Sequence, residues 1–381
     1  MRKFVRISVV LAVAVFPFLV QAQSSLNFTG SGARASAMGY AFTGVADDAT
    51  AISWNAAGLS QLIAPEASVI ARISAGSIST EGADYSLDKS SNFNLNFASF
   101  VFPLSTGTTS IVLGGAYRNI FDMNRTLTYK NTSTGSVTTS KSTGGVYGIS
   151  PAVAVQFMPN FSFGATFNLL TGKQENSLET DGSSMGSGSS TKFSGTSIEI
   201  GALAKFTSFA LGANYKMPYA LKMKNSDSES TLNVPPFISL GVAFWLTQNL
   251  MFSVDYQARP WSKATWSTEG SEDTNAGLED CNSIHFGGEF VINFGGLAIP
   301  LRAGFYTTPQ PWKDDADKKV TGGMLTLGTG LVLGKVSLDA SLEMGGQTYQ
   351  SEFYDYSTDT SQLSETTDAD VIFTVGATIG L

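Results

Sequence analysis

Hydrophobic and polar residues alternate one by one in several stretches of the chain. Residues 92–97 read Asn-Phe-Asn-Leu-Asn-Phe, and residues 196–200, 337–343 and 371–377 follow the same rule. Successive side chains of a β-strand point to opposite faces, so this period of two predicts strands with one apolar and one polar face. Gly and other small residues often occupy the polar face, where charged residues would otherwise lie.

Counting such stretches predicts about fourteen strands, and an even number is typical of bacterial single-chain barrels. The predicted strands lie near residues 65–77, 91–103, 109–120, 144–158, 161–172, 192–206, 208–220, 234–247, 249–259, 283–294, 297–308, 321–333, 335–348 and 368–381. The pattern therefore predicts an all-β protein.

The connections between these strands are alternately short and long. The short ones are 158–160, 207–208, 247–249, 294–296 and 334–335, and the long ones are 121–143, 173–191, 221–233, 260–282, 309–320 and 349–367. Outer-membrane barrels have tight periplasmic turns and long extracellular loops. A soluble secreted all-β protein, the alternative, has no reason to sort its loops in this way. Residues 65–381 are therefore predicted to form a transmembrane antiparallel β-barrel.

The first residues have the pattern of a secretory signal peptide. Met1-Arg2-Lys3 and Arg6 are positive, residues 7–20 are apolar, and Ala22 offers a small-residue cleavage point. Residues 1–22 are thus predicted to be removed on export. Residues 23–64 show little alternation but many small residues. Such a segment either trails in the periplasm or folds into the barrel as a compact plug.

Composition supports a membrane barrel and excludes several other functions. Only 14% of residues are charged, while Gly and Phe number 39 and 26, as suits a barrel with an apolar outer face. A net charge of −8 argues against nucleic-acid binding. Cys281 is the single cysteine of the chain, which excludes an internal disulfide. His285 is the single histidine, so the sequence offers no metal site. No cofactor is predicted. One His, with Ser283 on the same strand face, is thin support for an enzyme, so none is predicted.

Two runs near the N-terminus resemble the hatch of FadL-type outer-membrane transporters. They are Ser-Gly-Ala-Arg-Ala-Ser-Ala-Met-Gly-Tyr-Ala-Phe at residues 31–42 and Ala-Asp-Asp-Ala-Thr-Ala-Ile-Ser-Trp-Asn-Ala-Ala-Gly-Leu at residues 46–59. The family ends this segment with Asn-Pro-Ala-Gly, whereas this chain has Ala56 at the proline position. Residues 234–262 and 300–306 also resemble the family.

The resemblance implies a fourteen-stranded barrel with residues 23–64 as a hatch in its lumen. The hatch residues would include Arg34, Asp47, Asp48, Asn55 and Gly58. It further implies a monomer in the bacterial outer membrane, among lipid and lipopolysaccharide, that passes hydrophobic compounds such as long-chain fatty acids by passive diffusion. Alkanes and aromatic hydrocarbons would suit an apolar pocket equally well. PorV-like relatives, which serve a secretion system without transporting, share the hatch-like opening and are the first alternative. A polar-solute porin is the second, and a hatch in the lumen counts against it.

Alternation places Arg118 and Arg302 on the inner face of the wall. Each either pairs with a substrate carboxylate or holds the barrel together through a lumen salt bridge. Met123 and Met185 are apolar residues in long polar loops and are candidates for a substrate groove.

Gly114-Gly115 interrupts the strong strand from Ile111 to Tyr117, and paired glycines weaken strands or mark bends. The resemblance implies a kink in this third strand, through which an apolar solute would leave sideways into the membrane. An ordinary packing role for the two glycines is the alternative.

Overall fold

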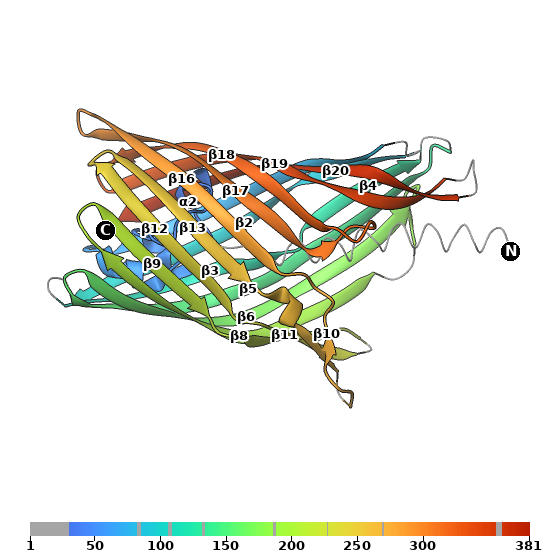
Figure 1. The fold of residues 1–381 in the computed structure, drawn as a ribbon, viewed down its shortest axis with the longest axis horizontal. Helices are drawn as coiled ribbons and strands as arrows, with labels where there is room; N and C mark the ends of the chain where they lie inside the picture. Colours follow the sequence, from blue (N-terminus) through green and yellow to red (C-terminus); the bar gives the residue numbers. More distant parts are fainter. Residues whose placement is uncertain are drawn as a thin grey trace.

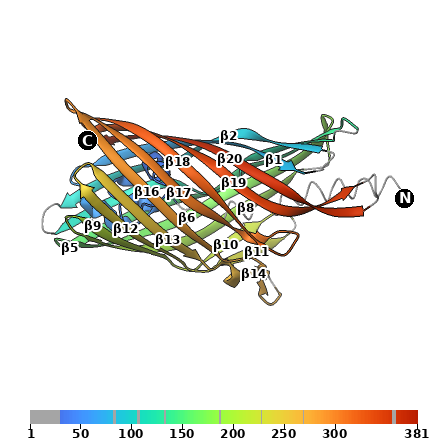
Figure 2. The ribbon, with the colours of Figure 1, turned by 45° about the horizontal axis from the view of Figure 1, so that its top comes forward.

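Fourteen antiparallel strands form one closed ring in the computed structural model, which describes residues 30–81, 85–105, 109–131, 134–185, 188–226, 228–268, 270–355 and 360–381 (Figures 1 and 2). In ring order they are β1 (Glu66–Thr80), β2 (Tyr85–Ser105), β3 (Ser110–Asp122), β5 (Val137–Met158), β6 (Phe161–Thr180), β8 (Ser189–Lys205), β9 (Phe209–Lys216), β12 (Phe237–Thr247), β13 (Leu250–Arg259), β16 (Cys281–Phe294), β17 (Leu297–Lys313), β18 (Lys319–Leu333), β19 (Val336–Asp355) and β20 (Thr360–Gly380). The last strand pairs with the first, from Glu66 opposite Gly380 to Thr80 opposite Thr366, and this pairing closes the barrel. The predicted signal peptide lies outside the described residues.

The alternation read from the sequence corresponds to the two faces of this wall. On β13, Phe252, Val254 and Tyr256 are 38–46% exposed, whereas Ser253 and Asp255 between them are buried. Apolar side chains on the outer face find lipid instead of water, and polar side chains on the inner face find partners in the lumen. The predicted barrel of about fourteen strands is confirmed.

Short turns lie at one end of the barrel and long connections at the other, which we call the turn end and the loop end. At the turn end, Gly295 and Gly296 join β16 to β17 with φ of 57° and 90°, a conformation that glycine adopts without strain. At the loop end, the Val137 amide and the Ser136 hydroxyl donate to Asp181 at 2.8 and 3.0 Å. These bonds hold the pKa of that carboxyl below its usual range.

Several segments predicted as loops contain strands. The loop end carries β4 (Arg125–Asn131), β7 (Ser183–Ser184), β10 (Tyr219–Lys224), β11 (Glu229–Val234), β14 (Thr265–Thr268) and β15 (Thr274–Asn275). Above the membrane both faces of a strand meet water or loop residues, so these strands lack the strong apolar contrast that marks a lipid-facing strand.

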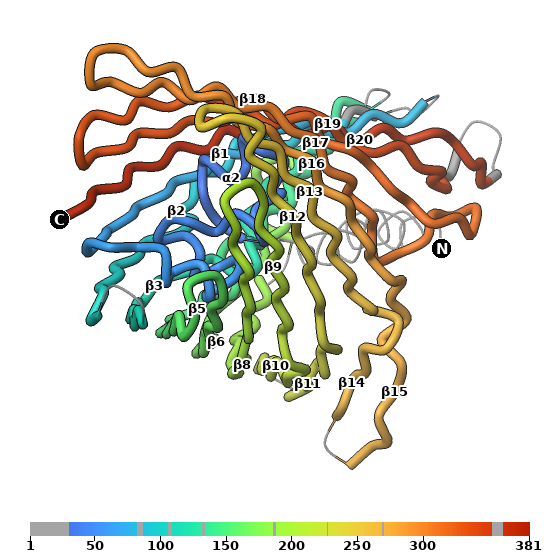
Figure 3. Tube along the Cα trace, turned by 60° about the vertical axis from the view of Figure 1, so that its left-hand side comes forward, coloured from blue at the N-terminus to red at the C-terminus, as the bar shows by residue number. Residues whose placement is uncertain are grey.

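Strands β10, β11, β14 and β15 branch away from the ring. β10 pairs with β8 and β11, and β11 pairs with β14. In Figure 3 the pair β14 and β15 projects from the loop end of the barrel. Beneath this branch a short 3-10 helix, η4 (Trp261–Lys263), buries Trp261 completely.

Residues 30–64, which we call the N-terminal segment, run through the inside of the ring at the turn end (Figure 1). The segment contains α2 (Ala33–Ala37) and the 3-10 helices η2 (Ala49–Ser53) and η3 (Ala56–Gln61). Nearly all of its residues up to Leu62 are buried. Among the residues that the structure describes, none of the helices has the length and apolarity to cross a membrane.

Candidate functional site

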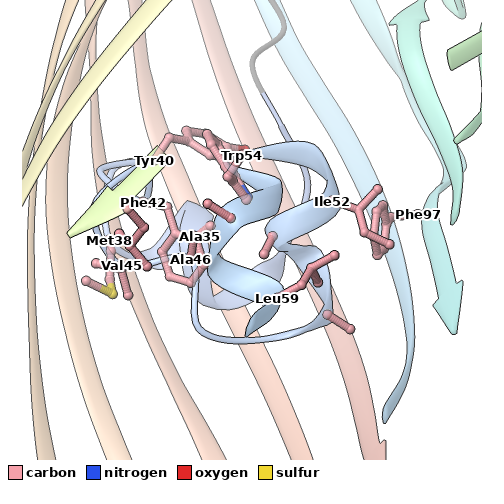
Figure 4. Packing of buried hydrophobic residues seen from close by; sticks show 14 of the residues in the cluster. Ala35, Met38, Tyr40, Phe42, Val45, Ala46, Ile52, Trp54, Leu59 and Phe97 are labelled. Carbon is pink, nitrogen blue, oxygen red and sulfur yellow. The ribbon is translucent and has the colours of Figure 1, made fainter. Parts of the chain in front are cut away.

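The N-terminal segment packs against a ring of inward-facing glycines, which we call the glycine ring (Figure 4 shows the apolar side of this packing). Its members come from nine strands: Gly114, Gly164, Gly201, Gly212, Gly241, Gly287, Gly304, Gly328 and Gly376. A Cβ on Gly212 would overlap the carbonyl oxygen of Thr43, and one on Gly287 would overlap the carbonyl oxygen of Met38. Glycine in these strands therefore lets the backbone of the segment approach the backbone of the wall.

Polar side chains of the wall satisfy the backbone of the N-terminal segment where it has no regular structure. Asp255 accepts hydrogen bonds from the amides of Phe42 and Thr43 at 2.9 and 2.7 Å. In the other direction, Asn55 donates to the carbonyl oxygens of Thr43 and Ala202 at 3.1 and 2.9 Å. Buried backbone groups without partners would destabilise the segment, so these bonds keep it in place.

A charged network joins the N-terminal segment to the wall. Arg34 bonds both carboxylate oxygens of Glu289 at 2.9 Å and one oxygen of Asp47 at 2.6 Å. Arg302 contacts Glu289 and Asp339, each at 2.6 Å. A two-pronged guanidinium–carboxylate contact is among the strongest and most directional polar interactions in proteins. The predicted hatch residues Arg34 and Asp47 are thus brought together with two strands that are far away in sequence.

The remaining predicted hatch residues shape the segment itself. Asp48 and Asn55 are the N-caps of η2 and η3, accepting from the amides of Thr50 and Ala57. A Cβ on Gly58 would overlap the carbonyl oxygen of Ala46, so the chain needs glycine there. Ala56, which stands where the resembled family has proline, is the first residue of η3; proline is favoured at that position but not required.

Toward the loop end the lumen opens into a cavity of about 330 Å³, which we call the loop-end cavity. Tyr40 of the N-terminal segment, His285 and Tyr306 line one side of it. The Tyr40 and Tyr306 hydroxyls donate to the two oxygens of Glu343 at 2.8 and 2.7 Å. The charged residues of its lining are the cations Arg72, Lys89, Arg125 and Arg259 and the acids Asp122, Asp368 and Asp370. This charged lining differs from the apolar pocket that the sequence suggested.

Arg125 is among the cations of the loop-end cavity that the sequence did not single out. Arg125 lies at the start of β4, and its buried Nε and Nη1 atoms have no hydrogen-bond partner in the described part of the chain. By contrast, Lys89 is paired with Asp368 and, at 2.9 Å, with Asp370. Guanidinium nitrogens that are buried without acceptors carry a desolvation cost that an anionic group would relieve. The signal in the sequence was the alternation Arg125-Thr-Leu-Thr-Tyr within a predicted loop.

An apolar cluster adjoins the cavity, and we call it the loop-end cluster. It consists of Ile120, Phe121, Val146, Leu170, Phe193, Tyr219, Leu221, Leu232, Val234, Trp261, Ala264, Leu278 and Cys281. Met123 both packs against this cluster and lines the cavity. Met185, the other predicted groove residue, is 43% exposed at a hairpin tip and is not among the cavity-lining residues. Of the two methionines, only Met123 lies where a groove residue is expected.

The two predicted substrate-binding arginines are buried and already paired within the protein. Arg118 donates to Asn168 at 3.0 Å and to Glu199 at 3.1 Å, and Arg302 is held by Glu289 and Asp339. Neither lines the loop-end cavity. Arg118 instead lines a smaller cavity of about 60 Å³. These contacts favour the salt-bridge role that the sequence left open.

The predicted wall kink at Gly114-Gly115 does not interrupt the sheet. β3 stays in register through both glycines, opposite Val101 and Phe100 on one side and Ala152 and Pro151 on the other. Gly114 belongs to the glycine ring, and Gly115 has open space around the position of a Cβ. The pairing of the next two strands, β5 and β6, is interrupted instead at Ser150 and Pro151. No bulge is present at the glycine pair in the described residues 109–131.

Comparison of sequences finds no matching family model and no matching curated relative. Comparison of structures finds a FadL homologue and toluene transporters. A Pseudomonas aeruginosa FadL homologue is 14% identical, with 90% of this chain and 96% of that chain covered and a TM-score of 0.64. The chain has the FadL-type fold. The toluene transporter TodX of Pseudomonas putida (13% identity, 93% and 99% coverage, TM-score 0.65) and TbuX of Ralstonia pickettii (14%, 93% and 99%, 0.60) share this FadL-type fold.

The outer surface of the barrel is suited to a membrane. The outward residues of the fourteen strands form an apolar surface that includes Phe290, Leu301 and Leu327, which are 46–55% exposed. In water such a surface would be aggregation-prone, but in a bilayer it is solvated by lipid chains. The protein is a bacterial outer-membrane β-barrel.

Proposed function

We propose that this protein is an outer-membrane channel through which hydrophobic compounds diffuse passively. The observation that carries the proposal is the loop-end cavity, where the apolar loop-end cluster meets a charged lining above a lumen filled by the N-terminal segment. A water-filled pore would not help an apolar solute. A protected apolar surface beside polar groups gives such a solute a place to leave the polysaccharide layer.

In this proposal the N-terminal segment acts as the plug. Its packing on the glycine ring and its contacts with Glu289 and Asp255 support a plug that stays seated. The solute would then leave beside the plug, sideways through the wall. The region around Gly115 and Pro151 supports such an exit, because proline has no amide hydrogen for the ladder and glycine adds no side chain to cover it.

The finer part of the proposal concerns the substrate, which we infer to be an amphiphile with an acidic head, such as a long-chain fatty acid. A neutral hydrocarbon gains nothing from the cations of the cavity and would displace the water that solvates them. A carboxylate would supply an acceptor for the Nε and Nη1 atoms of Arg125. Met123, Leu127 and Ile372 of the cavity lining would contact its alkyl chain.

The first experiment measures uptake of labelled oleate and labelled toluene by bacterial cells that lack their own fatty-acid transporter and express this chain. Uptake of oleate above the empty-vector control, with the protein verified in the outer membrane, supports the proposal. Uptake of toluene alone would keep the channel but contradict the acidic head. If neither compound is taken up, the channel function is wrong.

A matched pair of variants sharpens the test. Arg125→Gln should lower oleate uptake about tenfold, since a charge-assisted hydrogen bond contributes on the order of 1.5–3 kcal/mol, and should leave toluene uptake unchanged. Lys173→Gln serves as the control because Lys173 is an exposed loop-end cation paired with Glu175 and lies outside the cavity. Equal uptake by both variants would remove Arg125 from the site.

A PorV-like role in a secretion system is the second candidate, and the projecting branch formed by β10, β11, β14 and β15 favours it. Such a branch offers another protein a surface at the loop end that a small-molecule channel does not require. Deleting residues 265–275, which include β14 and β15, distinguishes the candidates. Unchanged oleate uptake after the deletion would agree with the channel, and loss of secretion in the native cell would agree with the PorV-like role.

A further inference from the structure

The single histidine of the chain is held in a defined orientation at the edge of the loop-end cavity. His285 lies on the inner face of β16, and its Nδ1 is 2.8 Å from the carbonyl oxygen of Gly39 in the N-terminal segment. A carbonyl oxygen only accepts, so the hydrogen of this bond belongs to Nδ1. The ring also stacks on Tyr306, with 5.6 Å between centroids and 6° between planes. Its position and its tautomer are therefore both set by neighbours.

Ser283 forms a hydrogen bond with Nε2, the other ring nitrogen of His285. Its Oγ is 2.8 Å from His285 Nε2, and both residues line the cavity. With the hydrogen of a neutral ring on Nδ1, Nε2 is an acceptor and the serine hydroxyl must donate. The result is a serine hydroxyl bonded to a base, with the base oriented by a third group. This is the arrangement that activates a serine for attack on a carbonyl carbon.

The neighbouring strand supplies a cation to the lining of the same cavity. β13 pairs with β16 so that Gln257 is opposite Ser283 and Arg259 is opposite Cys281. Arg259 is therefore diagonal to Ser283, a relation within reach of a long side chain, and it lines the same cavity. The Arg259 guanidinium donates to Gln257 at 2.6 Å and lies 5.9 Å from the centre of the Phe237 ring. Its positive charge in the cavity lining favours the negative oxygen that develops when a hydroxyl adds to an ester.

We propose that Ser283 is a nucleophile that accepts acyl groups from ester-containing amphiphiles in the loop-end cavity, with His285 as its base. In the first step Oγ forms a bond to the ester carbonyl carbon, its proton moves to Nε2, and the alcohol leaves with that proton as the acyl–oxygen bond breaks. In the second step water attacks the acyl-serine, gives a proton to Nε2, and the free acid leaves as Oγ recovers the proton. No oxidant, reductant or metal takes part.

The test is covalent labelling of the full, detergent-purified barrel with a fluorophosphonate probe. We expect one labelled site, on the peptide that contains Ser283, lost in Ser283→Ala and reduced about a hundredfold in His285→Asn, the range for removing a general base. The matched control is Ser253→Ala, which removes an inward-facing serine of β13 that has no partner for its hydroxyl among the described residues. Labelling should be unchanged in this control.

A second readout separates chemistry from folding. Each variant is first shown to keep the compact, heat-modifiable form of a folded barrel on a gel. Hydrolysis of p-nitrophenyl butyrate should then be lost in Ser283→Ala and kept in Ser253→Ala. Wild-type barrel that is not labelled, or that is labelled to the same extent in folded Ser283→Ala, overturns the proposal. Because labelling is measured on the purified protein, its failure leaves the oleate uptake result, and hence the channel function, untouched.

Discussion

The two halves of the lumen are lined by the same fourteen strands but have opposite characters. At the turn end the strands present glycine, and the N-terminal segment lies directly against their backbones. At the loop end the same strands present Arg, Asp, Ser and Tyr around a cavity. β16 contains both types in one strand, with Gly287 under Met38 and Ser283 at the cavity.

This difference shows how the lumen of one barrel can be filled at the turn end and open at the loop end. Where the inner face is glycine, the distance between wall and filling is that of two backbones, so little room is left for water. At the loop end the inner face carries Arg72, Lys89 and Arg125 around a cavity that the segment does not fill. The glycine ring thus marks where the segment meets the wall backbone to backbone, and the charged side chains of the loop end line the space that remains.

The largest expected effect comes from adding side chains to the glycine ring at the turn end, where the N-terminal segment leaves no room for them. In the double variant Gly201→Val/Gly212→Val the new Cβ atoms would overlap Asn55 and the carbonyl oxygen of Thr43. Overpacking typically costs about 1–3 kcal/mol at each site, so we expect the N-terminal segment to leave its seat. Large antibiotics that are normally excluded should then enter the cells.

Gly115→Val is the control for this variant, because a Cβ on Gly115 meets nothing within 4 Å. Cells that express it should exclude the antibiotics as wild-type cells do. Intact exclusion by the double variant would show that the segment is not what closes the lumen.

A smaller effect is expected from breaking the charged contact between segment and wall. Arg34→Ala leaves Glu289 and Asp47 without one cation each, and Arg302 still pairs with Glu289. Truncating one partner of a buried pair costs on the order of 3 kcal/mol, reduced here because the Arg34 side chain is 20% exposed. Limited proteolysis near the N-terminus should become several-fold faster than in wild-type barrel.

The comparison for Arg34 is the exposed pair of Lys173 and Glu175, whose side chains are more than half exposed. Lys173→Ala should change proteolysis very little, since exposed pairs contribute about 0–1 kcal/mol. Equal behaviour of the two variants would mean that the Arg34 network does not hold the segment.

The smallest expected effect distinguishes the two methionines at the open end. Met123→Ala removes a side chain that joins the loop-end cluster to the cavity and should lower oleate uptake a few-fold without unfolding the barrel. Met185→Ala removes an exposed side chain at a hairpin tip and should have no measurable effect. The reverse order of effects would relocate the groove to the hairpin tips.

The barrel could be predicted because its rule is local. Lipid on one side and lumen on the other impose a period of two on every strand, so stretches such as residues 92–97 reveal both the strand and its faces. The caps at Asp48 and Asn55 are also local, since each side chain bonds an amide two residues ahead.

The partners of inward-facing charges could not be predicted, because they depend on strands far apart in sequence. From the sequence, Arg118 and Arg302 could either bind a substrate carboxylate or form lumen salt bridges, and only the closed ring brings Glu199 and Glu289 to them. Arg125, in a segment that lacked the lipid-facing signal, is one of the four cations that line the cavity.

The sequence alone determined that this protein is a barrel with a distinct N-terminal segment and with alternating short and long connections. These features could be predicted because strand periodicity and turn residues depend on only a few neighbouring positions. Only the tertiary structure decided which glycines support the segment, which cations line the cavity, and that His285 meets the carbonyl oxygen of Gly39. The physical reason is that closing the ring joins residues that are far apart in sequence, such as Glu66 and Gly380. The partners of inward-facing residues then depend on contacts across the lumen, which a local sequence pattern does not contain.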